Sequence, residues 1–257
     1  MKEKKRMKKG SKAFLITLGS LVAVLVIIFL TVFILAKQKK IFINKWFVNE
    51  TGSTIGVDVS AYQAEIDMQK LKAQNISFIY IKATEGSKTQ DEKFAQNWQN
   101  ARDADLVSGA YHFFSYDSAG KTQAENFIKT VGTDMKGRLL PAVDVEYYGD
   151  KEQNPPAKED VVRELKVFLE LVEKAYGVKP LIYTRADIYD NYLKGEFDGY
   201  KKWISSLYTP LSWNYKDDWY LWQYLNRGEL DGYTGGEQYI DLNILNSEKS
   251  LEELIIN

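Results

Sequence analysis

Residues Leu139–Tyr148 have the sequence LLPAVDVEYY, and this stretch decides the fold of the chain. It is apolar, apart from the break at Pro141, until it ends in acid, which is typical of a buried strand that leads into a polar loop. Successive side chains on a strand point to opposite faces, so Asp144 and Glu146 point the same way. Two such carboxyl groups resist being charged together, which raises one pKa and supplies both an acid and a carboxylate. The alternative is a pair of solvated residues that open a loop.

Apolar strands alternate with amphipathic helices on both sides of this stretch. Further strands are predicted at residues 54–59, 77–83, 107–114, 180–184, 203–205, 220–224 and 239–245, and helices at 68–74, 92–104, 122–131 and 160–176. This alternation indicates βαβ units and a parallel sheet, hence the α/β class. With about eight strands in about 200 residues and few helices in the second half, the sequence predicts a small (β/α) barrel.

Acidic and aromatic residues recur at the ends of the predicted strands. In a barrel of parallel strands the reactive groups lie at the carboxyl ends of the strands. The acids there are Asp58, Glu85, Asp144, Glu146 and Asp241, and the aromatic residues are Tyr62, Tyr111, Tyr147, Tyr148, Tyr183, Trp222 and Tyr224. Aromatic rings beside carboxylates are suited to a sugar, because the rings stack on its C–H face and the acids bind its hydroxyls. The alternative for each aromatic residue is a place in the core.

The N-terminal region joins a basic segment to a long apolar one. Residues 1–12 hold seven Lys or Arg and one acid, and the 24 residues 13–36 contain no charged side chain. A helix of that length exceeds the ~30 Å hydrocarbon core of a bilayer, and a cleaved signal peptide has an apolar region of only about 7–15 residues. We expect a signal anchor, with cleavage near Ala36 as the alternative. The heavier positive flank predicts a cytoplasmic N-terminus and an extracellular remainder.

The near-neutral charge of the chain hides two opposite parts. Residues 1–40 carry a net charge of +9, and residues 41–257 carry −10. An acidic outer domain argues against nucleic-acid binding. The chain has no cysteine, so it forms neither disulfides nor thiolate metal sites. We find no cofactor motif and no carboxylate or histidine cluster with metal-ligand spacing, so no metal or cofactor is expected.

Six short motifs follow one another between residues 54 and 246. They are GVDVS (56–60), IKATEG (81–86), GAYHF (109–113), DVE (144–146), WQY (222–224) and DLN (241–243). In this order and spacing the chain resembles glycoside hydrolase family 25, the lysozymes (N-acetylmuramidases) that cut bacterial peptidoglycan. The resemblance implies a barrel with about five βα units followed by three strands nearly without helices.

The resemblance also implies roles for the acids. Glu146 would protonate the leaving oxygen, and Asp144 would orient the 2-acetamido group of the substrate, whose carbonyl attacks the anomeric carbon with retention of configuration. Asp58 and Asp241 would flank the pair and help to set its protonation states. The substrate-binding residues expected on the same face are Tyr62, Glu85, Tyr111, Tyr147, Tyr183, Trp222 and Tyr224.

Some positions depart from the family pattern. Asn75 and Ala64 stand where glycine, or for Ala64 also proline, is common, and Thr89 stands where an aromatic or aliphatic residue is usual. Asn tolerates a left-handed conformation, so the turn at Asn75 is expected to persist. These loops border the expected cleft and affect substrate preference rather than the acids. His112 is the only histidine, and a structural role is favoured over a catalytic one.

These patterns predict four segments: a cytoplasmic basic tail (1–12), a transmembrane signal anchor (13–36), a juxtamembrane linker (37–53) and a catalytic barrel (54–257). In the linker, Trp46 and Phe47 lie either at the lipid interface or, for Trp46, against the barrel. The expected partners are peptidoglycan glycan strands and, through residues 13–36, the lipid bilayer. Cell-envelope or secretion-apparatus proteins are further candidates.

Two other functions remain open. A chitinase-like amidosugar hydrolase would use the same acids with different rim loops. A catalytically silent glycan-binding scaffold would keep the barrel, but a pure binder has no need for the matched acids Asp58, Asp144, Glu146 and Asp241. The favoured hypothesis is a membrane-anchored muramidase that acts outside the cell in wall remodelling.

Overall fold

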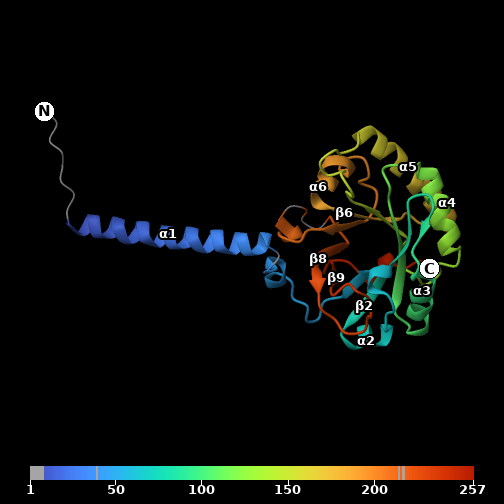
Figure 1. The fold of residues 1–257 in the computed structure, drawn as a ribbon, viewed down its shortest axis with the longest axis horizontal. Coiled ribbons are helices and arrows are strands. Elements are labelled where there is room, and N and C mark those ends of the chain that lie inside the picture. Colours follow the sequence, from blue (N-terminus) through green and yellow to red (C-terminus); the bar gives the residue numbers. More distant parts are fainter. Residues whose placement is uncertain (1–8, 39, 214, 216–217) are drawn as a thin grey trace. The chain divides into compact units, whose positions relative to one another are not determined.

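The computed structural model describes residues 9–38, 40–213, 215 and 218–257 (Figure 1). The chain divides into two compact units between Ile43 and Asn44. In the first unit, α1 (Lys9–Lys37) contains the apolar stretch Phe14–Ala36, with a mean hydropathy of 3.0. A helix of 23 residues is about 34 Å long, which is enough to cross the hydrocarbon core of a bilayer. Length and composition alone do not separate a membrane-spanning helix from a signal sequence near the N-terminus.

The second unit alternates strands with helices. Its strands are β1 (Ile55–Val59), β2 (Ile76–Glu85), β3 (Thr89–Gln90), β4 (Val107–Phe113), β5 (Ala142–Val145), β6 (Leu181–Arg185), β7 (Lys202–Ser205), β8 (Leu221–Gly228) and β9 (Ile240–Leu245). Its α-helices are α2 (Met68–Ala73), α3 (Phe94–Asp103), α4 (Gly120–Val131), α5 (Lys158–Tyr176) and α6 (Ala186–Ile188). The π-helical turn η3 (Tyr189–Leu193) continues α6. Short 3-10 turns are η1 (Ile43–Trp46), η2 (Ala61–Gln63), η4 (Leu211–Trp213) and η5 (Leu251–Leu254).

Eight of these strands close into a barrel. The order around it is β1-β2-β4-β5-β6-β7-β8-β9, and β9 pairs with β1 to complete the ring. Neighbours from β1 to β8 are parallel, whereas β9 is antiparallel to both β8 and β1. The short β3 pairs with the end of β2 and, among the described strands, with no other. The predicted barrel is confirmed: five βα units end at β6–α6, and β7, β8 and β9 follow without an α-helix in the described residues.

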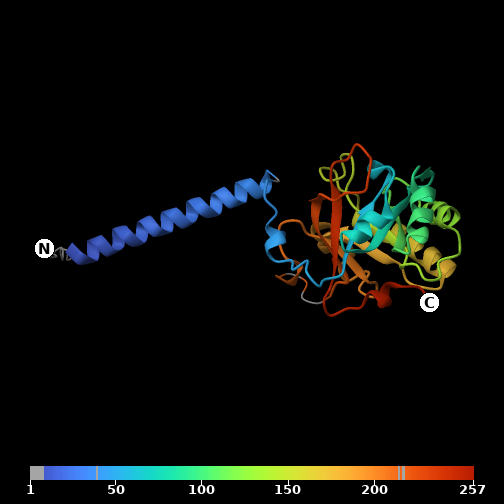
Figure 2. The same cartoon turned by 90° about the horizontal axis from the view of Figure 1, so that it is seen from below.

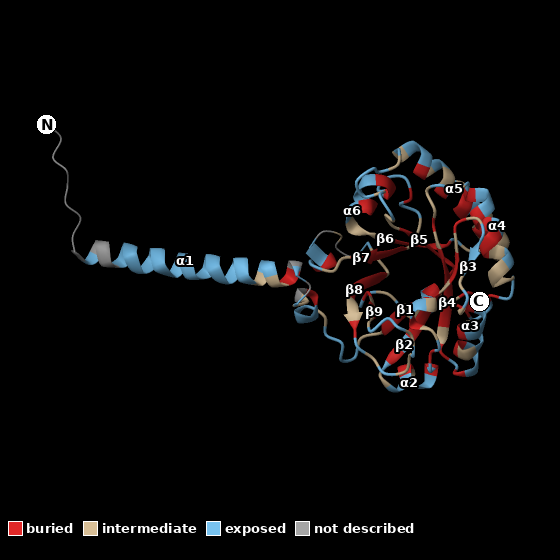
Figure 3. Cartoon of the chain, in the orientation of Figure 1, coloured by how far each residue is buried: buried red, intermediate tan, exposed pale blue. Residues whose placement is uncertain are grey.

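The helices cover one side of the barrel. α3, α4 and α5 lie outside β2, β4 and β5, whereas none of the described α-helices of the second unit covers β8 and β9 (Figures 1 and 2). The predicted stripe of α5, which consists of Val161, Leu165, Phe168, Leu169 and Val172, is buried. Figure 3 shows buried strands and helices with exposed outer faces. Large rings fill the interior, and Trp203 packs between Tyr80 and Tyr183 at centroid distances of 4.8 and 4.7 Å.

Two turns next to the short helices have unusual backbone angles. Asn75, directly after α2 and its cap, has a φ of +66°, so the predicted left-handed turn is confirmed. Ala64, which follows η2, has a φ of +54°. An alanine in such a conformation carries strain that a glycine would not have. The α6–η3 segment was not expected, because its eight residues are too short for a helical pattern to be recognised in the sequence.

Gly120, the first residue of α4, lies close to the backbone of α5. A Cβ atom on it would lie 1.9 Å from the carbonyl oxygen of Glu164, whose side chain accepts a hydrogen bond from the Gly120 amide at 2.9 Å. Gly120→Ala is therefore expected to lower the free energy of unfolding by about 1–3 kcal/mol, because the two helices must separate. Gly236→Ala is the control, since its Cβ would meet nothing within 4 Å. Equal urea midpoints for the two variants would contradict this packing.

Candidate active site

Four acids face the barrel interior at one end. Asp58 on β1 is paired in register with Asp241 on β9. Because β9 is antiparallel, its first residues lie at the same end as the carboxyl ends of the parallel strands. Asp144 on β5 pairs with Phe113 and Tyr183 of the neighbouring strands, and Glu146 follows one residue past the end of β5. Alternation along β5 therefore places Asp144 and Glu146 on the same, inner face.

Asp58 is held by two amide side chains. Asn243 donates to its Oδ2 at 2.7 Å and Gln223 donates to the same atom at 3.2 Å. Asn243 is itself oriented by the Trp203 indole, which donates to its Oδ1 at 2.7 Å. Burial raises the pKa of Asp58, while hydrogen bonds from Asn243, Gln223 and Asp241 oppose the rise. These donors favour the charged form of Asp58.

The pKa of Asp241 is the more strongly raised of the two. Burial raises its pKa well above the usual range, and the charges of Asp58 and Glu146 raise it further. The hydrogen bond between the two carboxyl groups raises the pKa of Asp241 further and lowers the pKa of Asp58. A proton on Asp241 that is donated to the Asp58 carboxylate satisfies both shifts.

Asp144 is the most enclosed of the four acids, with 8% of its surface exposed. Burial raises its pKa well above the usual range, the charges of Glu146 and Asp58 add to the rise, and the Lys82 ammonium opposes it. Among the described residues, its Oδ1 atom is buried without a hydrogen-bond partner. A buried oxygen without a partner is costly, so this atom is available to a donor from a bound molecule.

Glu146 has a pKa suited to proton transfer near neutral pH. Burial raises its pKa to about 7; the Arg185 guanidinium opposes the rise and the Asp58 charge supports it. The Tyr183 hydroxyl lies 3.4 Å from its Oε1, and that hydroxyl also donates to Gln223 at 3.0 Å. A carboxyl group with such a pKa is protonated in a large fraction of molecules at pH 7, as a general acid requires.

Arg185 gives a direct test of this assignment. Its guanidinium is paired with Asp187 and Glu152 and stabilises the charged form of Glu146. In Arg185→Gln the pKa of Glu146 should rise, so the acid keeps its proton to higher pH and the alkaline limb of kcat/KM moves upward. Arg163→Gln removes an exposed arginine from α5 and should leave that limb in place. A downward shift for Arg185→Gln would contradict the assignment.

The other predicted binding residues form two groups. Tyr111 and Tyr183 are buried near the acids, whereas Tyr62, Glu85 and Tyr147 are more exposed. Burial, followed by the charges of Asp58, Asp144 and Asp241, raises the pKa of the Tyr111 hydroxyl. Tyr183 similarly faces Glu146. In the loop after β5, Tyr147 contacts Tyr116 and Tyr192 at centroid distances of 6.2 and 6.1 Å. Tyr62 on η2 is 76% exposed, and Glu85 forms a 2.7 Å ion pair with Lys82. Glu85 also lines an open cavity of about 380 Å³ with Phe113 and Tyr148.

Trp222 and Tyr224 lie outside this cluster, contrary to the expectation that they share the face of the acids. The Trp222 indole donates to the Ser206 carbonyl at 2.9 Å, and Tyr224 is fully buried with its hydroxyl donating to Glu50 at 2.8 Å. The two residues flank Gln223 on β8, and alternation sends both to the outer face of the barrel. Gln223 is the residue of this motif that points inward.

The structure adds four residues to the predicted site. They are Lys82, Arg185, Gln223 and Asn243, through the contacts described above. Strand alternation was the available signal for Lys82, Arg185 and Asn243, because each has the same parity as an acid or a tyrosine on its own strand. Gln223 lies opposite Asn243 in the β8–β9 pair. Lys82 also lies 4.8 Å above the centroid of the Phe113 ring.

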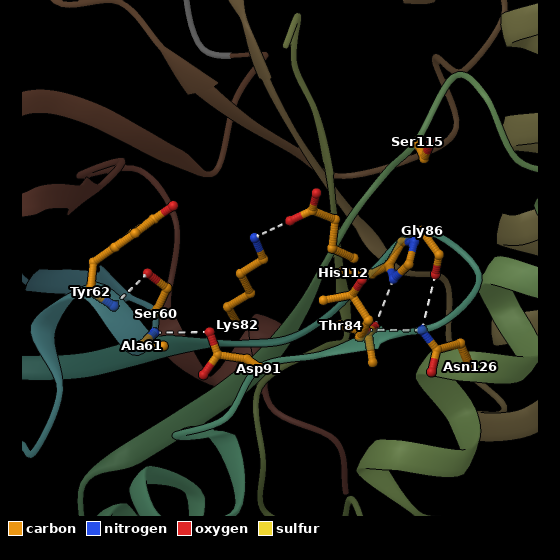
Figure 4. Close-up of polar contacts among 12 residues, drawn as sticks. Ser60, Ala61, Tyr62, Lys82, Thr84, Gly86, Asp91, His112, Ser115 and Asn126 are labelled. Carbon is orange, nitrogen blue, oxygen red and sulfur yellow. Dashed lines mark hydrogen bonds and ion pairs between the residues drawn. The ribbon is translucent and has the colours of Figure 1, made fainter. Parts of the chain in front are cut away.

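His112 belongs to a separate network behind the sheet (Figure 4). It is fully buried, its Nδ1 lies 2.7 Å from the Thr84 hydroxyl, and its Nε2 lies 3.1 Å from Gln123 Oε1. Burial lowers its pKa to about 4, so the ring is neutral. Its ring stacks on Phe168 of α5 at 4.8 Å. His112 thus links β4 to the helices, in agreement with the structural role favoured by the sequence.

Comparison with known proteins identifies the family. The family described as "Glycosyl hydrolases family 25" matches residues 57–233. The chain belongs to glycosyl hydrolase family 25. It is 36% identical over 205 residues to the "Uncharacterized protein YegX" of Escherichia coli K12, covering 77% of this chain and 71% of that one. It is 29% identical over 201 residues to "Lysozyme M1" of Streptomyces globisporus, covering 72% and 66% of the two chains.

Solved family 25 structures have the same barrel. A family 25 glycosyl hydrolase from Bacillus anthracis aligns with a TM-score of 0.73 and 45% identity, covering 80% of this chain and 95% of that chain. Family membership and the lysozyme relatives make this protein a glycosidase.

Proposed function

We propose that this family 25 glycosidase is an N-acetylmuramidase. It hydrolyses the β-1,4 bond between N-acetylmuramic acid and N-acetylglucosamine in peptidoglycan. The observation that carries the proposal is the pair Asp144 and Glu146 on one inner face of β5, with the pKa of Glu146 raised to about 7. The names of lysozyme relatives agree with it. The acidic domain suits an uncharged sugar backbone rather than an anionic polymer.

The proposed reaction has two steps. In the first, Glu146 donates its proton to the glycosidic oxygen while the 2-acetamido carbonyl of the substrate bonds to the anomeric carbon and the leaving sugar departs. In the second, the Glu146 carboxylate takes a proton from water, whose oxygen attacks the anomeric carbon and reopens the ring intermediate. Configuration is retained, and no enzyme carboxylate becomes covalently attached.

Asp144 supports the acetamido group in this scheme. The N–H of that group would donate to the buried Oδ1 atom that has no partner among the described residues. This bond favours the charged form of Asp144, which then stabilises the positive charge that develops on the intermediate. Lys82 already favours the charged form from the other side.

The remaining residues bind and set protonation. Asp58, in its charged form, and its protonated partner Asp241 would bind sugar hydroxyls. The negative charge of Asp58 would also help Glu146 to keep its proton. We assign substrate contacts to Tyr62, Glu85, Tyr111, Tyr147 and Tyr183. Trp222 and Tyr224 are left out of this set because of their outward orientation.

The proposal includes a transmembrane tether that holds the barrel at the outer face of a bacterial membrane. Residues 13–36 would span the bilayer, residues 1–12 would remain in the cytoplasm, residues 37–53 would form the connection, and residues 54–257 would act outside. The length and hydropathy of Phe14–Ala36 support the span, and the Lys-rich residues 1–12 support the orientation. Carbonate-resistant membrane association, with the barrel digested by protease added to spheroplasts, would support this topology. Release by carbonate would contradict it.

Activity is tested by offering the chain two amidosugar polymers. We expect soluble sugars to be released from purified peptidoglycan much faster than from chitin. Faster release from chitin would establish the chitinase-like function instead. Binding to peptidoglycan without release would establish the scaffold function.

A further inference from the structure

Three exposed aromatic side chains of the second unit form a patch on the outside of the barrel. Trp46, Phe47 and Trp213 are 68%, 51% and 64% exposed. The rings of Phe47 and Trp213 meet edge to face, with centroids 5.5 Å apart. We call these three residues the aromatic patch. Trp46 is the neighbour of Phe47 in the chain. Exposed aromatic side chains that meet, as those of Phe47 and Trp213 do, mark an interaction surface more often than isolated ones do.

The segment that carries Trp46 and Phe47 is fixed to the barrel. The fully buried Asn44 donates from its Nδ2 to the carbonyls of Ser206, at 2.5 Å, and Tyr224, at 3.4 Å. Farther along, Glu50 accepts the hydrogen bond of the Tyr224 hydroxyl. Residues 44–50 are thus bonded to β8 and to the loop after β7. The aromatic patch therefore has a defined place on the barrel and does not belong to a free linker.

The sequence places this patch close to the apolar segment. Trp46 follows Ala36, the last residue of that segment, by ten residues, and ten residues extend at most ~36 Å. No acidic residue lies between Glu3 and Glu50, whereas Lys40 and Lys45 lie on the connection itself. Trp rings prefer the headgroup level of a bilayer, and lysines are attracted to anionic lipids.

We propose that the aromatic patch docks on the headgroup interface of the membrane, with Trp46, Phe47 and Trp213 inserted among the lipids. This rests on the proposed anchor in residues 13–36. Ser206, which accepts the Asn44 hydrogen bond, directly follows the carboxyl end of β7, the end of the barrel at which the acids lie. Docking thus holds that end of β7 at a fixed distance from the lipid surface, and glycan strands next to the membrane become the preferred substrate.

The test uses the fluorescence of the full chain in nanodiscs. The six tryptophans all lie at or after Trp46, and α1 contains none. Lipids brominated near the headgroup end of their acyl chains quench tryptophans that enter the interface. We expect quenching of the parent chain and the loss of most of it in Trp46→Phe/Trp213→Phe, which keeps the patch apolar. Trp98→Phe, on α3 and partly exposed, should keep the quenching.

Three outcomes would overturn the proposal. The first is equal fluorescence in brominated and plain discs, and the second is quenching that survives in Trp46→Phe/Trp213→Phe. The third is quenching that disappears when each disc holds two chains, which would show that a second copy of the chain covers the patch. Failure of the anchor is distinguishable, because the chain would then not enter the disc. Failure of the muramidase proposal is also distinguishable, because activity is measured separately on soluble glycan fragments.

Discussion

Replacement of Glu146 by glutamine is expected to lower kcat on peptidoglycan by roughly 10²–10⁴-fold, the usual contribution of a general acid. Glutamine keeps the size of the side chain and can still accept from Tyr183, but it has no proton to give to the glycosidic oxygen. KM should change little, because binding of the ground state does not depend on that proton. The measurement is the rate of release of soluble muropeptides, with circular dichroism to verify the fold.

The matched control for this variant is Glu159→Gln. Glu159 is an exposed carboxylate in the first turn of α5, where its replacement should leave kcat unchanged. A folded Glu146→Gln variant with more than a tenth of the parent rate would show that another group supplies the proton. Asp241 would then be the next candidate, because its pKa is also raised and it faces the same cluster.

Replacement of Asp144 by asparagine is expected to lower kcat by roughly 10²–10³-fold, comparable with the loss of one electrostatic contact to a transition state. Asparagine still accepts a hydrogen bond from the acetamido N–H, but it brings no negative charge to the intermediate. It also removes a buried charge that raises the pKa of Tyr111, so the fold should tolerate the substitution. The effect should appear in kcat more than in KM.

A kcat close to that of the parent would contradict the role of Asp144, since it would mean that the carboxyl group remains protonated throughout the reaction. Asp103→Asn is the control. Asp103 is exposed at the end of α3 and accepts a hydrogen bond from Gln99 at 2.7 Å. The two variants together separate the charge of an enclosed carboxylate from a general effect of removing a charge.

The barrel was predictable because its strands are short apolar runs that end in acid. Leu139–Tyr148 contains the buried strand Ala142–Val145, and alternation alone placed Asp144 and Glu146 on one face. The five βα units and three final strands followed from the resemblance and from the scarcity of helices after Tyr176. The antiparallel direction of β9 was not predictable, because apolar periodicity carries no direction. The pairings of β9 with β1 and with β8 establish this direction.

The error at Trp222 and Tyr224 has a different cause. Aromatic residues suit sugars, which favours the cleft for both, whereas strand alternation, which places Asp144 and Glu146 on one face, places Gln223 inside instead. For these two residues, position along the strand is therefore a better guide than residue type. Gln223 reaches both Asp58 and Tyr183, so the amide, not the rings, is the functional part of this motif in the structure.

Long-range contacts formed the third class of features that the sequence did not reveal. Asn44 bonds to Ser206 and Tyr224 across more than 160 positions, and no local pattern indicates such a contact. The same holds for Arg185, whose charge acts on Glu146 from the next strand. Contacts of this kind depend on the closure of the barrel, which brings distant loops together only after the strands have paired.

The measurement that tests the muramidase assignment most directly is the identity of the new reducing ends. Purified peptidoglycan is digested by the parent chain and by Glu146→Gln, the products are reduced with borohydride, and the terminal sugars are identified by mass spectrometry. The proposed function predicts reduced muramic acid at the new ends from the parent and almost none from the variant. Reduced glucosamine at those ends, or equal amounts from both chains, would contradict it.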